Sequence, residues 1–269
     1  MTFKEYLRSS TPRLYHLLAT AYQQTPLYRR QLSKMAARQI RQEQGLLQSV
    51  FDQDLTVRHG PFQGMHYINQ ACGSRILPKV AGCYENRLHP WIEQGIQRGY
   101  RQVIDVGCAE GYYAVGMALR LPEARILAYD LNDRARELCH ELAQANNVDS
   151  HIQTQRECTH SELNRVGGKG CLVICDIEGS EDTLLDPDRA PSLKHCDLIV
   201  ETHDCLVPGI SQVLINRFSA THDIETIVDA PPRTPDFPFL LEIADEDRKF
   251  IIDEDRPPGM RWLRMNSKI

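Results

Sequence analysis

Short apolar segments alternate with amphipathic segments through the middle of this chain of 269 residues. Each apolar segment has five or six residues, the length and composition of a strand that is buried on both faces. Strands of this kind that alternate with helices form parallel sheets with helices on both sides. The sequence therefore predicts a doubly wound α/β fold with strands at 102–106, 125–130, 171–176 and 197–201.

The segments between these strands repeat apolar residues at helical spacing. A weaker strand at 151–157 and a late strand at 259–265 complete the expected α/β region. The expected helices are 85–98, with a kink at Pro90; 112–121; a stripe from Ala135 to Leu142 that ends at Asn146–Asn147; and a segment from Pro208 to Phe218.

The first part of the chain follows a different pattern. Thr11–Pro12 resembles a helix start, and a second helical stripe follows Pro26 and fades near Gly45. The segment 56–68 has β-branched and aromatic residues around glycines, which indicates a short hairpin. We therefore expect a helical cap with a small β hairpin over 1–70, followed by the α/β domain over 71–269.

The composition is that of a globular protein, with 42% apolar and 25% charged residues. A net charge of −5 provides no basic footprint for nucleic acid. The sequence contains no signal-peptide core and no apolar run long enough to span a membrane, so we expect a cytoplasmic protein without a membrane partner. The nine cysteines are odd in number and form no C-x-x-C pair, which favours reduced thiols. A homodimer is compatible with the sequence.

The segment VIDVGCAEGYY, residues 103–113, places a glycine turn after the first predicted strand. A dinucleotide fingerprint that starts at Gly107 needs glycines where Ala109 and Tyr112 stand. A P-loop needs glycine and lysine where Tyr112 and Tyr113 stand. The carboxylate of Asp105 would also repel a pyrophosphate. These departures argue against phosphate binding and against a nicotinamide oxidoreductase.

A second acid, Asp130, ends the next strand in the segment YDLN. A carboxylate at this place accepts hydrogen bonds from ribose hydroxyls. The glycine turn lets the backbone approach a nucleoside closely, and the following helix N-terminus favours a ligand carboxylate. S-adenosylmethionine, which has an amine, a carboxylate, a ribose and a positive sulfur, fits this arrangement.

The motifs also resemble those of a known enzyme class. VIDVGCAEGYY with AYDLN resembles motifs I and II of the class I S-adenosylmethionine-dependent methyltransferases. LVICDIEGSEDTLL is similar to the D-x-E-G-x-E segment of the FkbM family, and LPKVAGCYENRL and LIVETHD are similar to other FkbM-like stretches. The resemblance covers about 70–220 and implies a mostly parallel, Rossmann-like, seven-stranded sheet with helices on both faces.

The resemblance also implies the residues that hold S-adenosylmethionine. Asp105 or Glu110 would face the methionyl amine, Asp130 would hold the ribose, and Leu131 would lie beside the adenine. Cys158, next to Glu157, falls where related folds contact the adenine. The expected cofactor set is Asp105, Gly107, Cys108, Ala109, Glu110, Gly111, Tyr112, Asp130, Leu131, Cys158 and Asp176.

Methyl transfer to a hydroxyl needs a proton acceptor, and acids and a histidine follow the fourth and fifth strands. His203 is the preferred base because its ordinary pKa lies near neutral pH. A histidine in an exposed loop is the alternative for His203, and an acid at a helix N-terminus is the alternative for Glu178. The candidate catalytic residues are Asp176, Glu178, Glu201 and His203, with Glu181 and Asp204 beside them.

Other functions for these acids stay open from the sequence. Asp176, Glu201 and His203 could ligate a divalent metal that orients a substrate oxygen. The acidic run DEDRKFIIDEDRP near the C-terminus is expected to be a solvated surface. DIEG stands where enzymes that methylate base amines have a D-P-P-Y-like turn, which argues against a nucleic-acid substrate.

We therefore expect O-methylation of a small molecule, such as a sugar or a natural-product intermediate, with the cap over 1–70 closing on it. The alternatives are N-methylation of a small molecule or peptide, and a methyltransferase-fold protein that binds without turnover.

Overall fold

The structure is a computed structural model that describes residues 26–228, 230, 237–257 and 259–269. The helix expected at Thr11–Pro12 lies outside these residues. The chain divides into two compact units, Met1–Gln53 and Asp54–Ile269. In the first unit, helix α3 (Pro26–Ser49) continues past Gly45, where the sequence predicts that it fades. Residues 54–70, which were expected to belong to the N-terminal cap, group with the second unit.

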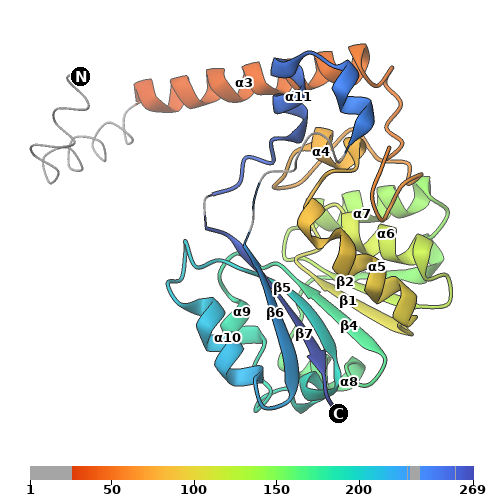
Figure 1. Ribbon diagram of the computed structural model, residues 1–269, viewed down its shortest axis with the longest axis vertical. Coiled ribbons are helices and arrows are strands. Elements are labelled where there is room, and N and C mark those ends of the chain that lie inside the picture. The colour runs from red at the N-terminus through yellow and green to blue at the C-terminus, as the bar shows by residue number, and fades with distance from the viewer. Residues whose placement is uncertain (1–25, 229, 231–236, 258) are drawn as a thin grey trace, which may run out of the picture. The chain divides into compact units, whose positions relative to one another are not determined.

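The second unit is built on a seven-stranded sheet, which confirms the α/β fold expected from the sequence (Figure 1). The strands lie in the order β3-β2-β1-β4-β5-β7-β6. Strands β1 to β5 are parallel, and β7 pairs antiparallel with both β5 and β6. The strands are β1 (Gln102–Val106), β2 (Arg125–Tyr129), β3 (Ile152–Gln155), β4 (Cys171–Cys175), β5 (Asp197–Thr202), β6 (His222–Val228) and β7 (Arg261–Ser267).

Strand β6 is the one strand that the sequence analysis did not predict. It forms an edge of the sheet, and in HDIETIV only His222 is buried. An edge strand of this kind has too few apolar residues to give the pattern of a strand buried on both faces. The expected late strand is confirmed as β7, which begins and ends two residues later than predicted.

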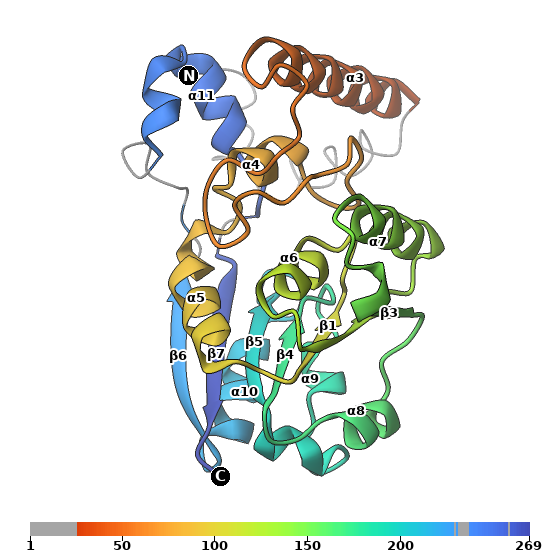
Figure 2. The same cartoon turned by 90° about the vertical axis from the view of Figure 1, so that its right-hand side faces the viewer.

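Helices cover both faces of the sheet (Figures 1 and 2). Helices α8, α9 and α10 contribute Leu163, Leu184 and Phe218 to a hydrophobic core with alternate residues of the strands, such as Ile104 and Val173. On the opposite face lie α5, α6 and α7. The helices are α5 (His89–Arg98), α6 (Tyr112–Arg120), α7 (Asp133–Ala145), α8 (His160–Val166), α9 (Glu181–Leu184) and α10 (Ile210–Phe218).

Two of these helices begin as simple local rules require. Helix α5 begins at His89, with a proline in its first turn and one 3₁₀ turn (Asn86–Leu88) before it, where a kinked helix over 85–98 was expected. Helix α7 is capped by Asn132, whose side chain accepts a hydrogen bond from the N–H of Arg134. Both starts therefore follow from local sequence.

The segment before β1 packs over the carboxyl ends of the strands. The expected hairpin is reduced to one antiparallel bridge between Thr56 and His66, followed by helix α4 (Ile76–Ala81). Near the C-terminus, helix α11 (Asp245–Ile252), which follows a 3₁₀ turn (Pro238–Glu242), packs against α4. In the acidic C-terminal run, Asp245, Glu246, Asp253 and Asp255 are exposed, as expected for a solvated surface. The side chains of Glu254 and Arg256, which are 8% and 14% exposed, depart from that expectation.

All nine cysteines are free thiols, as expected from their number and spacing. Within the part of the chain that the structure describes, no helix is both long enough and apolar enough to cross a bilayer.

Candidate active site

Two neighbouring cavities lie at the carboxyl ends of β1, β2, β4 and β5. The first has a volume of about 370 Å³ and reaches from the glycine turn after β1 to the end of β5. The second, of about 470 Å³, lies beside the ends of β2 and β4. Gly107, Asp130, Asp176 and Glu178 line both. This edge of an open α/β sheet is where ligands bind, so the two cavities form one candidate site with two compartments.

The turn after β1 depends on glycine at two positions. Gly107 has a φ of 81°, and a Cβ there would lie 1.7 Å from the carbonyl oxygen of Asp176. Gly111 has a φ of 94°, and its Cβ would lie 2.7 Å from the Sγ atom of Cys139. No side chain fits at either position without movement of the neighbouring segment. The two glycines thus let β1, β4 and α7 approach the turn closely, and α6 begins directly after it.

Asp130 is fixed at the boundary between the two cavities. Its two carboxylate oxygens accept hydrogen bonds from the N–H groups of Ala109 (2.9 Å) and Asn132 (2.8 Å). Each oxygen keeps a further lone pair for a ligand hydroxyl. Leu131, whose exposed fraction is 67%, and Cys158 line the second cavity. A polar group at the boundary and apolar groups beside it suit a nucleoside.

Asp105 is buried at the end of β1, with one carboxylate oxygen that lacks a partner among the described residues. Its exposed fraction is 3%, and it lines the first cavity. Burial and the nearby negative charge of Asp176 raise its pKa to about 8, although the N–H of Ala114 favours the ionised form. Its Oδ2 atom has no hydrogen-bond partner. A cationic group in the cavity would satisfy this carboxylate and favour its ionised form.

Glu110 was expected near the cofactor but lines neither cavity among the described residues. It is fully buried and forms an ion pair with Lys79, and it also accepts hydrogen bonds from the hydroxyl of Tyr67 and the N–H of Cys72. Burial opposes its ionisation, but Lys79 and these donors outweigh burial and lower its pKa. Glu110 therefore ties the segment 67–79 to the glycine turn.

The remaining members of the expected cofactor set lie as follows. Gly111 supports the turn from behind and, like Glu110, lines neither cavity among the described residues. The residues of the set that line one or both cavities are Asp105, Gly107, Cys108, Ala109, Tyr112, Asp130, Leu131, Cys158 and Asp176.

His203, just after β5, lies between two groups of carboxylates. Its Nδ1 atom is 2.8 Å from Oε1 of Glu181, which is fully buried. Its Nε2 atom is 3.3 Å from Oε2 of Glu178 and 3.5 Å from Oδ1 of Asp176. Burial disfavours the charged ring, but Glu181 and the other acids outweigh burial and raise the pKa of His203. The exposed-loop alternative for this histidine is therefore wrong: its exposed fraction is 3%.

Glu181 begins helix α9 and holds the histidine ring. Its Oε1 atom also accepts hydrogen bonds from the N–H groups of Ile177 (3.3 Å) and Gly179 (3.1 Å). Burial opposes ionisation, but His203 and these N–H groups outweigh it and lower the pKa of Glu181. An ionised Glu181 accepts the Nδ1 proton of His203, which leaves the lone pair of the neutral ring on Nε2.

His203 and the two acids near its Nε2 atom form the one candidate metal cluster among the described residues. Asp176, Glu178 and His203 place one potential ligand atom each within 4.8 Å of one another. Glu201, which was expected in this set, is not part of it, because its Oε1 atom accepts a hydrogen bond from Arg256. Asp204, a further expected acid, accepts a hydrogen bond from the hydroxyl of Ser211 at 3.0 Å.

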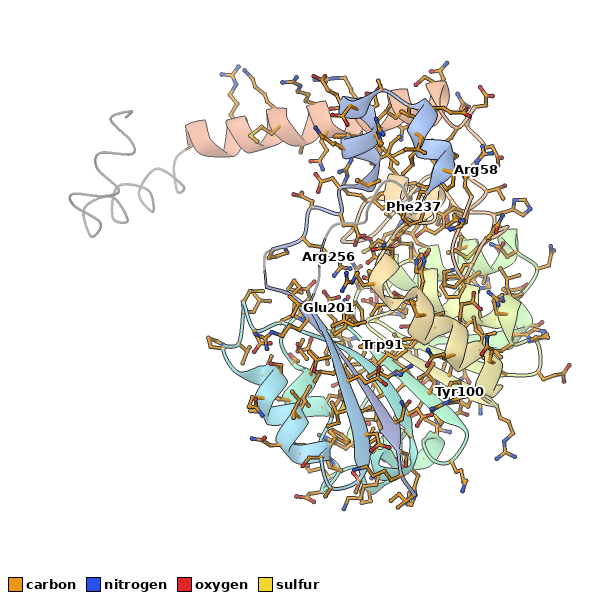
Figure 3. The ribbon with its side chains drawn as sticks, in the orientation of Figure 1. Arg58, Trp91, Tyr100, Glu201, Phe237 and Arg256 are labelled. Atoms are coloured by element: carbon orange, nitrogen blue, oxygen red, sulfur yellow. The ribbon has the colours of Figure 1, made fainter. Side chains whose placement is uncertain are left out.

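Glu201 belongs to a buried charge cluster around Arg256. Figure 3 shows Arg256 above the end of the sheet, close to Glu201. The guanidinium also contacts the carboxylates of Glu85 and, at 2.8 Å, Glu254. Burial and the nearby charge of Asp176 raise the pKa of Glu201 well above its ordinary value, and burial raises that of Glu254 to about 7. Three acids thus share one buried cation.

Several residues that line the first cavity were not recognised from the sequence. Lys79 stands in LPKVAGCYENRL, which the sequence analysis compared only with FkbM-like stretches. Arg256 stands in DEDRPPG, which was expected to be a solvated surface. Tyr84 and Trp262 lie near them: Lys79 Nζ is 4.8 Å and Arg256 Cζ 5.5 Å from the centre of the Tyr84 ring. Only the return of the chain from α11 brings Arg256 to the site, and no local pattern specifies that return.

Comparison with known protein families identifies one domain in this chain. The family model of the Methyltransferase small domain matches residues 93–165. A comparison with curated protein sequences finds no match. The strand order and the antiparallel β7 define the Rossmann-like α/β fold by themselves.

The solved structures that are similar to this chain share little sequence with it. The human methyltransferase 10 domain containing protein is 14% identical, with a TM-score of 0.49, and covers 82% of this chain and 98% of its own. A protein from Thermoplasma acidophilum is 14% identical, with a TM-score of 0.44, and the match covers 80% of this chain and 97% of that protein. An S-adenosylmethionine-dependent O-methyltransferase from Thermotoga maritima is 11% identical, with a TM-score of 0.44, and the match covers 67% of this chain and 64% of that protein.

Proposed function

We propose that this chain, a class I S-adenosylmethionine-dependent methyltransferase by its fold and by the domain that it matches, methylates a hydroxyl group of a small molecule with His203 as the proton acceptor. The observation that carries the proposal is the contact of 2.8 Å between His203 and Glu181. It leaves Nε2 of His203 beside Asp176 and Glu178, at the wall of the first cavity.

The residues of the two cavities fit S-adenosylmethionine. The unpartnered, buried oxygen of Asp105 suits the methionyl amine, and Asp130 suits the ribose hydroxyls. Leu131 and Cys158 supply apolar surface for the adenine in the second cavity. When bound, S-adenosylmethionine supplies an electrophilic methyl group on a positively charged sulfur.

The protein then has two tasks, alignment of the acceptor and removal of its proton. The rigid turn at Gly107 and the buried carboxylates fix the positions of the groups that line the cavity. His203 accepts the hydroxyl proton on Nε2, and the resulting imidazolium is stabilised by the ionised Glu181. A base of this kind increases a rate by about 10² to 10⁴-fold.

The proposal is tested in two steps. Isothermal titration with S-adenosylhomocysteine measures cofactor binding, and a screen of hydroxyl-bearing small molecules for methylation identifies an acceptor. With that acceptor, we expect His203→Gln to bind S-adenosylhomocysteine normally and to lose at least about 10²-fold in kcat. An unchanged kcat in His203→Gln would exclude His203 as the base.

A divalent metal at Asp176, Glu178 and His203 is the second candidate arrangement, favoured by the short separation of the three ligand atoms. The lone pair of Nε2 cannot bind a metal ion and accept a proton at the same time. Loss of activity after dialysis against EDTA, with recovery on addition of Mg²⁺ or Mn²⁺, would therefore favour the metal over the base.

Membership of the FkbM-like group is a further part of the proposal. It is supported by the turn Ile177–Glu178–Gly179, where DIEGSE places Glu178 at a φ of 55° next to His203. N-methylation, and binding without turnover, are distinguished from the proposal by identification of the methylated atom and by turnover itself.

A further inference from the structure

The first cavity has a strong excess of negative charge. Among the described residues, eight carboxylic acids line it, against two basic side chains, Lys79 and Arg256. Lys79 is paired with Glu110, which lies outside the lining, and Arg256 is paired with three acids of the cluster around it. Neither cation is therefore available to the acids nearest to His203.

Two buried carboxylate oxygens in this cavity accept no hydrogen bond from the described part of the chain. They are Oδ2 of Asp105 and Oδ1 of Asp176. Asp105, which is 3% exposed, lies at the end of β1, and Asp176 follows β4. The methionyl amine can satisfy one of them, and the other still needs a donor. The side chain of Asp176 is 35% exposed, but its Oδ1 atom is buried 3.5 Å from Nε2 of His203. A buried oxygen without a donor is destabilising, so these two oxygens favour ligands with two donor groups.

The neighbouring acids are crowded. Asp176 Oδ1 and Glu178 Oε2 lie 3.5 Å and 3.3 Å from the same Nε2 atom of His203, and three further acids meet at Arg256. Asp176 and Glu201 line the same cavity, at the ends of the neighbouring strands β4 and β5. Carboxylates held this close are stabilised by a cation or by protonation.

The aromatic part of the wall also suits a cation. Tyr84 and Trp262 line the same cavity. The Tyr84 ring already has two cations near it, Lys79 Nζ at 4.8 Å and Arg256 Cζ at 5.5 Å, and the Cζ atom lies 6.0 Å from the Trp262 ring. Acids and aromatic rings together are typical of sites that bind organic ammonium groups.

From these contacts we propose that the methyl acceptor carries an ammonium group, which binds the carboxylates of Asp176 and Glu201. The inference rests on the proposed function and adds the chemical class of the acceptor, a cationic amine with a hydroxyl group. A cavity lined by one sign of charge also concentrates ligands of the opposite sign. A carboxylate-bearing acceptor would meet repulsion at the same place.

The test uses three probes that share one phenol and differ in the charge of the side chain: tyramine (ammonium), tyrosol (hydroxyl) and para-hydroxyphenylacetate (carboxylate). Each is titrated calorimetrically into the full-length protein saturated with S-adenosylhomocysteine. We expect tyramine to bind at least about tenfold more tightly than tyrosol, the change that one favourable polar contact of ~1.4 kcal/mol gives, and the carboxylate to bind least. A tyramine affinity equal to that of tyrosol, or no binding by any probe, would overturn the inference.

Two variants and a control identify the carboxylates. Asp176→Asn and Glu201→Gln are expected to reduce the preference for tyramine to less than about twofold, whereas the exposed Glu123→Gln keeps it. Binding of S-adenosylhomocysteine without a preference for tyramine would reject the cationic acceptor alone, whereas failure of S-adenosylhomocysteine to bind would reject the proposed function. A preference for tyramine that appears only after EDTA treatment would also overturn the inference, because a metal ion would then be the cation that these acids hold.

Discussion

The Nδ1 atom of His203 lies 2.8 Å from the Oε1 atom of Glu181, and both side chains are buried. The two residues come from different parts of the sheet edge: Glu181 begins α9 after β4, and His203 follows β5. The contact fixes the ring and orients its second nitrogen toward Asp176 and Glu178. This pair is the part of the site from which the proposed chemistry follows.

Glu181→Gln should lower kcat by about 10²-fold, because glutamine cannot stabilise the imidazolium. Binding of S-adenosylhomocysteine should stay within about twofold of the wild-type value. Steady-state kinetics and titration calorimetry measure the two quantities. The nearby acid Asp188, which is exposed, provides the control Asp188→Asn, for which no change is expected. Equal kcat values for Glu181→Gln and the wild type would contradict the assigned positioning role.

The pH dependence of the reaction should follow the ionisation of His203. Only the neutral ring accepts a proton, and its pKa is raised above 6.5, chiefly by Glu181 against the effect of burial. We therefore expect kcat/KM to rise with pH to a plateau, with an apparent pKa above 6.5. In Glu181→Gln the rise should occur at lower pH. A rise at the same pH in both proteins would show that another group limits the reaction.

Stability should depend on pH through the same pair, in two opposite directions. The raised pKa of His203 gives a stabilisation that is complete below 6.5 and is lost as the pH rises through the folded value. The lowered pKa of Glu181 gives a stabilisation that is present above 4.5 and is lost as the pH falls through its folded value. Urea unfolding of wild type and Glu181→Gln across this range measures both; identical pH profiles would exclude the linkage.

Asp130→Asn tests the cofactor compartment. The asparagine keeps one acceptor oxygen but loses the charge that holds the N–H groups of Ala109 and Asn132. We expect S-adenosylhomocysteine to bind about 10 to 100-fold more weakly, which corresponds to one or two strong hydrogen bonds. The control is Asp149→Asn, an exposed acid in the turn before β3. Equal affinities for Asp130→Asn and the control would remove Asp130 from the site.

Gly107→Ala should destabilise the fold strongly, because its φ is 81° and its Cβ would lie 1.7 Å from the carbonyl oxygen of Asp176. We expect a loss of about 3 to 5 kcal/mol in the free energy of unfolding, from overpacking and the left-handed backbone together. Gly99→Ala has a similar φ of 69° with no atom within 4 Å of the Cβ. We expect Gly99→Ala to lower the free energy of unfolding by only about 1–2 kcal/mol. Denaturant titration separates the two, and similar losses would exclude the steric explanation.

Lys79→Met should also destabilise the protein, by about 3–5 kcal/mol, because it leaves the buried Glu110 without its cation. The double variant Lys79→Met with Glu110→Gln should recover part of this loss, since the glutamine oxygen still accepts from Tyr67 and Cys72. Lys249→Met, which removes an exposed pair with Asp245, is the control, with no measurable change expected. Additive losses in the double variant would contradict the coupling of the two residues.

The comparison of sequence and structure shows which features are local. The strands β1, β2, β4 and β5 could be predicted because burial on both faces requires continuous apolar segments. Strand β6 could not, because an exposed edge strand needs few apolar residues. The turn at Gly107 was also predictable, since its conformation permits few other residues.

The candidate site was only partly local. The positions of Asp105, Asp130, Asp176 and His203 at strand ends follow from the order of elements, because the carboxyl ends of parallel strands meet at one edge. The sequence does not separate the task of Glu110, which is buried against Lys79, from that of Asp105, which lines the cavity. Both stand in the same motif, and only packing distinguishes them.

The sequence by itself determined the buried strands, the glycine turn and the set of acids at the sheet edge, because backbone conformation and strand burial depend on neighbouring residues. The tertiary structure decided which of these acids share a cation and which share a histidine. Arg256 reaches Glu201 and Glu85 from positions 55 and 171 residues away. Such contacts depend on how the chain returns over the sheet, which is settled by the packing of the whole domain and not by any local pattern.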